Sequence, residues 1–198
     1  MNTIVHFELP ALSYRCVLNP RGRRRYGTLE QLCASGNGVQ STVGIADGSR
    51  VLDTSLRNSI QFKSVFLFNL NTIQTIEAKL KDLDGNAYWL DGQQFDVIEY
   101  SQGGFFKEHQ DKQINDTHYG TLLLFPPGFA HTGGDLVLNR GEFVFESSTN
   151  TSCKCIAFPT NTIHECKEVL SGKRLVLKTE LFRRIPLLPR DPVFQFVD

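Results

Sequence analysis

Long hydrophobic runs, net charge and a disulfide framework are all missing from this sequence of 198 residues. No apolar run approaches the roughly 20 residues that a membrane-spanning helix requires, so no transmembrane segment is expected. Basic and acidic side chains are equal in number, at 21 each, and the formal net charge is zero. Such a balance argues against nucleic acid and against an anionic membrane surface as partners.

Cysteine is also scarce, with five residues that form an odd and sparse set. Such a set is not typical of a small secreted protein held together by disulfides. The first residues, Met-Asn-Thr-Ile-Val-His, lack a basic segment followed by an apolar one, so no signal peptide is expected. We therefore expect a protein of a reducing compartment, the cytoplasm.

The composition is that of an ordinary globular protein, with 40% hydrophobic and 21% charged residues. The length suits one domain with its own core. Fifteen phenylalanines and many Val, Thr and Ile runs favour β structure. We expect a single domain over residues 1–198, in which residues 1–93 form N-terminal strands and a supporting helix, residues 94–182 a β-rich core, and residues 183–198 a tail.

One helix is clearly predicted, over residues 71–83. Its apolar residues recur at steps of three and four, which places them on one face, and Gly85 provides a stop. Asn71 or Thr72 would cap its start. A shorter helix is predicted from a Thr28 cap to Ala34, followed by a strand over Val39–Ile45.

Short strands separated by Gly-rich or Asn-rich breaks follow from residue 94 onward. Closely spaced strands with such turns are typical of a sandwich or jelly roll. The sequence therefore predicts a mainly β protein with supporting helices. The expected strands cover residues 95–100, 121–125, 135–139, 142–146, 152–158, 163–168 and 173–182.

Two histidines and one aspartate could form a metal site. His109 and Asp111 are two residues apart, so one strand would direct both to the same face. His164 lies on a different expected strand and could complete the set. Two imidazoles and one carboxylate on one face leave three octahedral positions open, the arrangement of a non-haem Fe(II) oxygenase site. Arg174, ten residues after His164, would suit the far carboxylate of a dicarboxylic cosubstrate.

These residues belong to a set of motifs in the order found in one family. The sequence resembles the Fe(II)- and 2-oxoglutarate-dependent dioxygenases of the prolyl 4-hydroxylase-like branch, over roughly residues 50–182. The motifs that carry the resemblance are Arg57-Asn58-Ser59, Tyr100 and Gly103 ahead of His109-Gln110-Asp111, Thr121 to Phe125, Gly133-Gly134-Asp135-Leu136, and His164 with Arg174.

The resemblance implies a double-stranded β-helix (a cupin-like jelly roll) and a set of roles for its residues. His109, Asp111 and His164 would hold Fe(II), Arg174 would pair with the distal carboxylate of 2-oxoglutarate, and Tyr100 would line the cosubstrate pocket. The implied reaction decarboxylates 2-oxoglutarate to succinate while dioxygen supplies one oxygen atom to a substrate C–H bond. Ascorbate is an implied reductant. The implied substrate is a prolyl residue of a peptide or protein.

The sequence departs from the family at Phe125, where many prolyl hydroxylases carry a tyrosine. Phenylalanine cannot donate a hydrogen bond, so Arg174 would need another helper. Lys178, on the same face of the expected strand, is the candidate. With this departure, other substrates remain as alternatives: a small molecule or a free amino acid. The alternative from a different class is a non-catalytic jelly-roll module that binds a ligand or partner.

Three further features have ordinary structural explanations rather than functional ones. The basic run of residues 21–25 and the lone Arg57 are typical of a solvated loop and a surface ion-pair partner, respectively. Cys153, Cys155 and Cys166 near His164 match no structural zinc spacing. Glu180 stands six residues after Arg174, where relatives that repair alkylated bases carry a second arginine, so a nucleic-acid substrate is not favoured.

Overall fold

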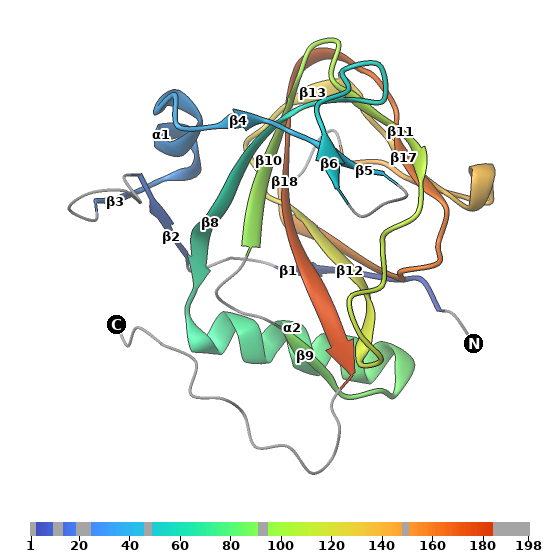
Figure 1. The fold of residues 1–198 in the computed structure, drawn as a ribbon. Helices are drawn as coiled ribbons and strands as arrows, with labels where there is room; N and C mark the ends of the chain where they lie inside the picture. Colours follow the sequence, from blue (N-terminus) through green and yellow to red (C-terminus); the bar gives the residue numbers. More distant parts are fainter. Residues whose placement is uncertain are drawn as a thin grey trace.

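The computed structural model describes residues 3–9, 14–18, 25–45, 49–90, 95–147 and 151–183. Within these ranges it contains two facing β-sheets, a short hairpin and two α-helices (Figure 1). Most of the basic run, residues 21–24, and the expected tail from residue 184 onward lie outside the described residues.

The larger sheet has eleven strands, most of them in the order β1-β16-β12-β18-β10-β8-β2-β3. β13 and β9 also pair with β18, and β4 pairs with β8. These strands are β1 (Val5–Leu9), β2 (Tyr14–Val17), β3 (Tyr26–Gly27), β4 (Val39–Gln40), β8 (Ile60–Phe68), β9 (Tyr88–Leu90), β10 (Phe95–Ser101), β12 (His118–Phe125), β13 (His131–Gly133), β16 (Cys153–Pro159) and β18 (Val169–Arg183).

The smaller sheet has five strands in the order β15-β14-β17-β11-β7. A separate hairpin is formed by β5 (Val43–Gly44) and β6 (Arg50–Val51). The strands of the smaller sheet are β7 (Arg57–Asn58), β11 (Phe105–His109), β14 (Leu136–Leu138), β15 (Phe143–Phe145) and β17 (His164–Cys166), with a 3-10 turn, η1, at Asn139–Gly141.

The chain alternates between the two sheets from β10 onward. β10, β12, β16 and β18 lie in the larger sheet, whereas β11, β14, β15 and β17 lie in the smaller one. All of these pairings are antiparallel. This alternation is the double-stranded β-helix, so the predicted fold class is confirmed. Each of the seven strands expected from residue 94 onward is present, with its bounds shifted by a few residues at most.

Side-chain parity divides the interior into two cores. Along β18, Leu175 and Leu177 point to the helix-covered face of the larger sheet, and Val176 points into the space between the sheets. Ile98 on the neighbouring β10 joins Val176 in the inner core. Because successive residues of a strand face opposite sides, a strand buried on both faces reads as a continuous apolar run. The functional side chains described below point to the same side of their strands as Val176, into the space between the sheets.

The long helix α2 (Leu70–Asp84) lies below the strands of the larger sheet (Figure 1). Ile73, Ile76 and Leu80 are buried in the outer core, which confirms the apolar stripe except at Leu83, which was expected on the same face and is 49% exposed. The helix ends as predicted at Gly85, which adopts a left-handed conformation with φ 77°. Its start was misplaced: Asn69 is the cap, and its side chain accepts a hydrogen bond from the backbone N–H of Thr72.

The N-terminal part contributes strands to the larger sheet and a short helix. Thr28 caps α1 (Leu29–Ala34) through a reciprocal pair of hydrogen bonds with Gln31. The strand predicted over Val39–Ile45 is instead divided, because β4 joins the larger sheet and β5 joins the hairpin. All five cysteines are free. Among the described residues, no helix has the length and hydrophobicity needed to cross a membrane.

Candidate metal and cosubstrate site

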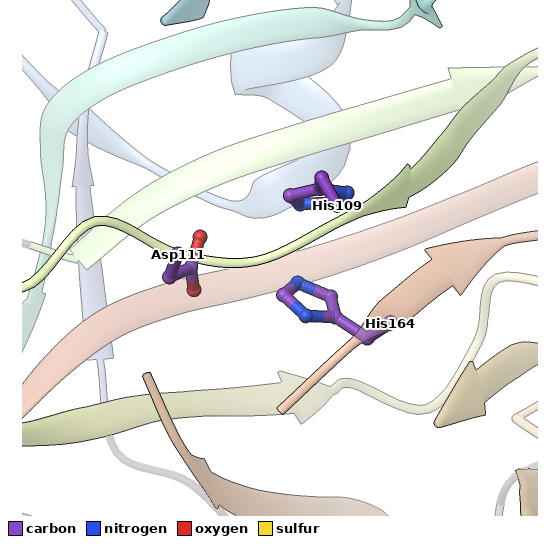
Figure 2. A group of neighbouring side chains, drawn as sticks. All are labelled: His109, Asp111 and His164. Carbon is purple, nitrogen blue, oxygen red and sulfur yellow. The ribbon is translucent and has the colours of Figure 1, made fainter. Parts of the chain in front are cut away.

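Two adjacent strands of the smaller sheet bring the candidate metal ligands together. His109 ends β11 and lies directly opposite His164 on β17, with ring centroids 4.1 Å apart. Asp111 follows just beyond the end of β11 rather than on it, and still turns toward the two rings (Figure 2). One ligand atom from each residue lies within 4.8 Å of the others. The predicted trio therefore converges on a space of the size that one metal ion needs.

Backbone carbonyls fix the orientation of both imidazoles. Nδ1 of His109 lies 2.8 Å from the carbonyl oxygen of Lys107, and Nδ1 of His164 lies 3.0 Å from that of Thr162. A carbonyl can only accept, so each Nδ1 donates and each Nε2 keeps its lone pair. This arrangement holds both rings in the form that binds a metal.

Electrostatics keep the two rings neutral. Burial, together with the neighbouring His164, lowers the pKa of His109 to about 4. Burial likewise lowers the pKa of His164 below its ordinary value. Both imidazoles are therefore available as ligands at neutral pH without first losing a proton.

Asp111 is held in its ionised form. Burial acts to raise its pKa, but the nearby Lys178, His164 and a hydrogen bond from Thr121 outweigh burial and lower the pKa to about 2. The Thr121 hydroxyl donates to Oδ2 of Asp111, and Nζ of Lys178 lies 3.9 Å from the same oxygen. These contacts on Oδ2 favour coordination through the other oxygen, Oδ1.

A cavity of about 830 Å³ between the two sheets contains this trio and also Arg174. Arg174 lies opposite Tyr100 in the β10–β18 register, and only 1% of its surface is exposed. Its guanidinium carbon lies 4.9 Å from the ring of Phe125 and 5.2 Å from that of Tyr100. Two of its nitrogens, Nε and Nη2, are buried and have no hydrogen-bond partner among the described residues.

A buried guanidinium without an acceptor is costly, because desolvation is not offset by a counter-ion. The aromatic rings return only about 0.5–2 kcal/mol through cation–π attraction. Gly134 makes room for the Arg174 side chain: a Cβ added there would lie 3.0 Å from Cδ of the arginine. The Arg174 guanidinium is therefore a strong hydrogen-bond donor placed to bind an anion.

Lys178 occupies a different part of the cavity from the one expected. It shares the face of β18 with Arg174, as predicted, but four residues separate them, about 13 Å along a strand. Its ammonium contacts Glu180 and lies beside Asp111, on the metal side. Glu180 in turn contacts Nε2 of His118 at 2.9 Å. Lys178 therefore neighbours the metal ligand Asp111, and a role at the distal carboxylate is not supported by its position.

Arg57 is the main candidate residue that sequence reasoning undervalued. It is not a surface ion-pair partner: only 6% of its surface is exposed, and it lines the cavity. Its guanidinium carbon lies 4.6 Å from the ring of Phe106, which stacks on His109 with centroids 3.6 Å apart. The signal in the sequence was the Arg57-Asn58-Ser59 motif. In the structure, the Ser59 hydroxyl accepts a hydrogen bond from Nε of Arg57 at 3.0 Å.

No family model matches the chain. A PKHD-type hydroxylase of Colwellia psychrerythraea is 28% identical over 142 residues, which cover 67% of this chain and 63% of that protein. The chain thus matches just under two thirds of the relative's length.

Two solved structures share the architecture. A 2OG-Fe(II) oxygenase family oxidoreductase of Burkholderia pseudomallei aligns with a TM-score of 0.51 at 17% identity, covering 74% of this chain and 73% of the other. A prolyl hydroxylase of Trichoplax adhaerens, in complex with a hypoxia inducible factor peptide fragment, aligns with a TM-score of 0.53 at 16% identity, covering 77% and 74%. The chain has the fold of the 2-oxoglutarate- and iron(II)-dependent oxygenases. The resemblance found in the sequence is confirmed.

Within this oxygenase fold, the metal-ligand trio, Tyr100, Arg174 and Lys178 all line one cavity, whereas Phe125 does not line it and packs against Arg174. His109, Asp111 and His164 lie on one side, Arg174 lies against Tyr100 and Phe125, and Lys178 lies by Asp111. Among the described residues, no zinc-type cluster forms around the cysteines, because the cluster suited to a metal contains only the two histidines and the aspartate.

Proposed function

We propose that this protein is an Fe(II)- and 2-oxoglutarate-dependent dioxygenase that hydroxylates a C–H bond, with a prolyl residue of a peptide or protein as the substrate. One observation carries the proposal: Arg174 is buried without an acceptor for two of its nitrogens, in the same cavity as the metal-ligand trio. A dicarboxylic cosubstrate that reaches both places supplies the missing acceptor.

The donor set fits Fe(II). Nε2 of His109, Nε2 of His164 and a carboxylate oxygen of Asp111 would hold the metal, which leaves three positions for the 2-oxo acid and dioxygen. The bound metal would supply the activation of dioxygen that the side chains cannot provide. The contributions of the chain are neutral imidazoles, an ionised carboxylate, and Arg174 as the anchor that orients the cosubstrate. Ascorbate is the proposed reductant.

Similar proteins support the proposed reaction. The Colwellia relative is named as a hydroxylase, and the Trichoplax protein is a prolyl hydroxylase with a bound peptide fragment. A small molecule or a free amino acid would suit the same metal chemistry. We place the enzyme in the cytoplasm, where its five free thiols would stay reduced.

An anaerobic titration with Fe(II) and 2-oxoglutarate tests the proposal. We expect the visible charge-transfer band of a 2-oxo acid chelated to iron, and succinate after air is admitted. The matched control is His109→Ala, which removes one ligand and should lose both signals. A non-catalytic binding module would give neither signal with the wild-type protein, and that result would overturn the enzyme assignment.

A further inference from the structure

A second buried arginine in the cavity, Arg57, has no counter-ion among the residues that the structure describes. Nε of Arg57 donates to the Ser59 hydroxyl at 3.0 Å, and Nη1 donates to the Thr42 carbonyl at a long 3.4 Å. Both acceptors are neutral. In the described part of the chain, the hydrogen bonds of the guanidinium are those of Nε and Nη1, and no carboxylate lies within ion-pair distance of it; Nη2 is not fully buried.

The acidic side chains that line the cavity are all engaged elsewhere. Each has a hydrogen-bond or ion-pair partner other than Arg57. Asp111 contacts Thr121 and Lys178, Glu180 contacts Lys178 and His118, Glu108 contacts Arg140 at 3.4 Å, and Asp96 accepts from Gln61 at 2.6 Å. The positive charge of Arg57 is therefore not neutralised from within the cavity.

The cosubstrate does not neutralise it either. On the proposed function, the two negative charges of 2-oxoglutarate meet Fe(II) and Arg174. The ring of Phe106 under the guanidinium offsets only part of the cost of burying the charge. A negative group on the substrate would supply a counter-ion, since the substrate is the remaining component of the reaction.

The position of Arg57 suits a substrate contact. β7 pairs with β11, so Arg57 lies on the side of His109 away from His164, one strand from the metal ligands. Exposed apolar side chains, Ile45 and Leu56, line the same cavity nearby and could cover the apolar part of a ligand. A group held at Arg57 would thus place an adjoining carbon near the metal.

We propose that Arg57 binds a carboxylate of the substrate, so that the substrate class is an acidic prolyl compound. The carboxylate belongs either to a proline at the end of a chain or to an acidic residue next to the proline. This inference rests on the proposed function and narrows its substrate.

Matched acid and amide probes test the inference by binding rather than by turnover. The protein is loaded with Zn(II), which is redox-inactive, and with saturating 2-oxoglutarate, so that Arg174 is occupied. N-acetyl-L-proline and its amide probe a chain-end carboxylate. N-acetyl-L-prolyl-L-aspartic acid amide and its asparagine counterpart probe a side-chain carboxylate. Each is titrated calorimetrically into the wild type, Arg57→Gln, Arg57→Lys and Arg50→Gln.

We expect the wild type to bind the acid of one pair about 10- to 100-fold more tightly than its amide, the gain of a charge-assisted hydrogen bond. The ratio should fall to about one in Arg57→Gln and stay above one in Arg57→Lys. Arg50, an exposed arginine of the same cavity that also contacts Thr42, is the control whose loss should leave the ratio unchanged.

Two outcomes would overturn the inference: no preference for either acid in the wild type, or a preference that persists in Arg57→Gln. If Arg57 only supports Phe106 against His109, Arg57→Gln weakens Zn(II) binding and leaves the acid-to-amide ratio unchanged. Failure of the proposed function has a separate sign, the absence of the Fe(II)–2-oxoglutarate band in the wild type.

Discussion

Replacement of Arg174 by methionine should change stability and cosubstrate binding in opposite directions. The guanidinium is 1% exposed, and two of its nitrogens have no acceptor. Methionine has a similar length and carries no charge, so the substitution removes an uncompensated desolvation cost. We expect the free energy of unfolding of the cosubstrate-free protein to stay equal or rise, by up to about 4 kcal/mol.

The same substitution should weaken 2-oxoglutarate binding severely. Two charge-assisted hydrogen bonds, each of about 1.5–3 kcal/mol, would be lost. The expected loss of affinity is therefore about 100- to 10,000-fold. Anaerobic titration of the charge-transfer band measures this affinity, and urea unfolding with and without 2-oxoglutarate measures the two stabilities.

The neighbouring Lys173→Met is the matched control. Its side chain is 55% exposed on the opposite face of β18 and pairs with Glu99. We expect some loss of stability, because Glu99 is only 7% exposed and loses its cation, and no change in cosubstrate affinity. If Arg174→Met instead destabilised the cosubstrate-free protein by several kcal/mol, the guanidinium would be a structural element, and the reasoning from its missing acceptors would be refuted.

Three further predictions concern the same cavity. Gly134→Ala should lower the free energy of unfolding by about 1–3 kcal/mol and weaken 2-oxoglutarate binding, because φ at Gly134 is 74° and a Cβ there would lie 3.0 Å from the Arg174 side chain. Urea unfolding measures the change in stability. Gly128→Ala is the control for backbone strain, because Gly128 also has a positive φ but a Cβ there would lie in open space. Thr121→Val should reduce metal affinity about 10- to 100-fold, because it removes the hydroxyl that holds Asp111, and equal affinity in a competition titration would contradict this role. The fold lowers the pKa of His109 to about 4, whereas the imidazole of the unfolded chain keeps its ordinary pKa near 6.5. Between these two values the unfolded chain binds more protons, so the stability of the folded protein falls as the pH falls. The metal-free protein should lose about 2 kcal/mol of stability between pH 7 and pH 5 that His109→Asn does not lose, and identical pH profiles of unfolding would refute the shift.

Local patterns accounted for most of the fold. The stripe of α2 follows from steps of three and four residues, and the buried strands follow from apolar runs between Gly and Asn breaks. The cap of α2 was misplaced by two or three residues, because Asn69, Asn71 and Thr72 are all capable caps and only backbone geometry selects among them.

The candidate metal site was predictable for a related reason. His109 and Asp111 lie on one short segment, so their proximity needs no knowledge of the fold. His164 was a candidate because it lies on another expected strand, and the family resemblance supported it, since spacing alone cannot show that β17 pairs with β11. Arg174 was likewise a candidate from its spacing to His164, and its missing acceptors became visible only with the cavity around it.

The sequence by itself determined which residues could act, because ligand type, strand period and motif order are written in the chain. The tertiary structure alone decided what surrounds each of them. Arg57 is buried because β7 packs beside β11, and Lys178 meets Asp111 because β18 passes that side of the cavity. Burial and counter-ions depend on contacts between strands far apart in the sequence, and those contacts turn an apparent surface arginine into a candidate substrate anchor.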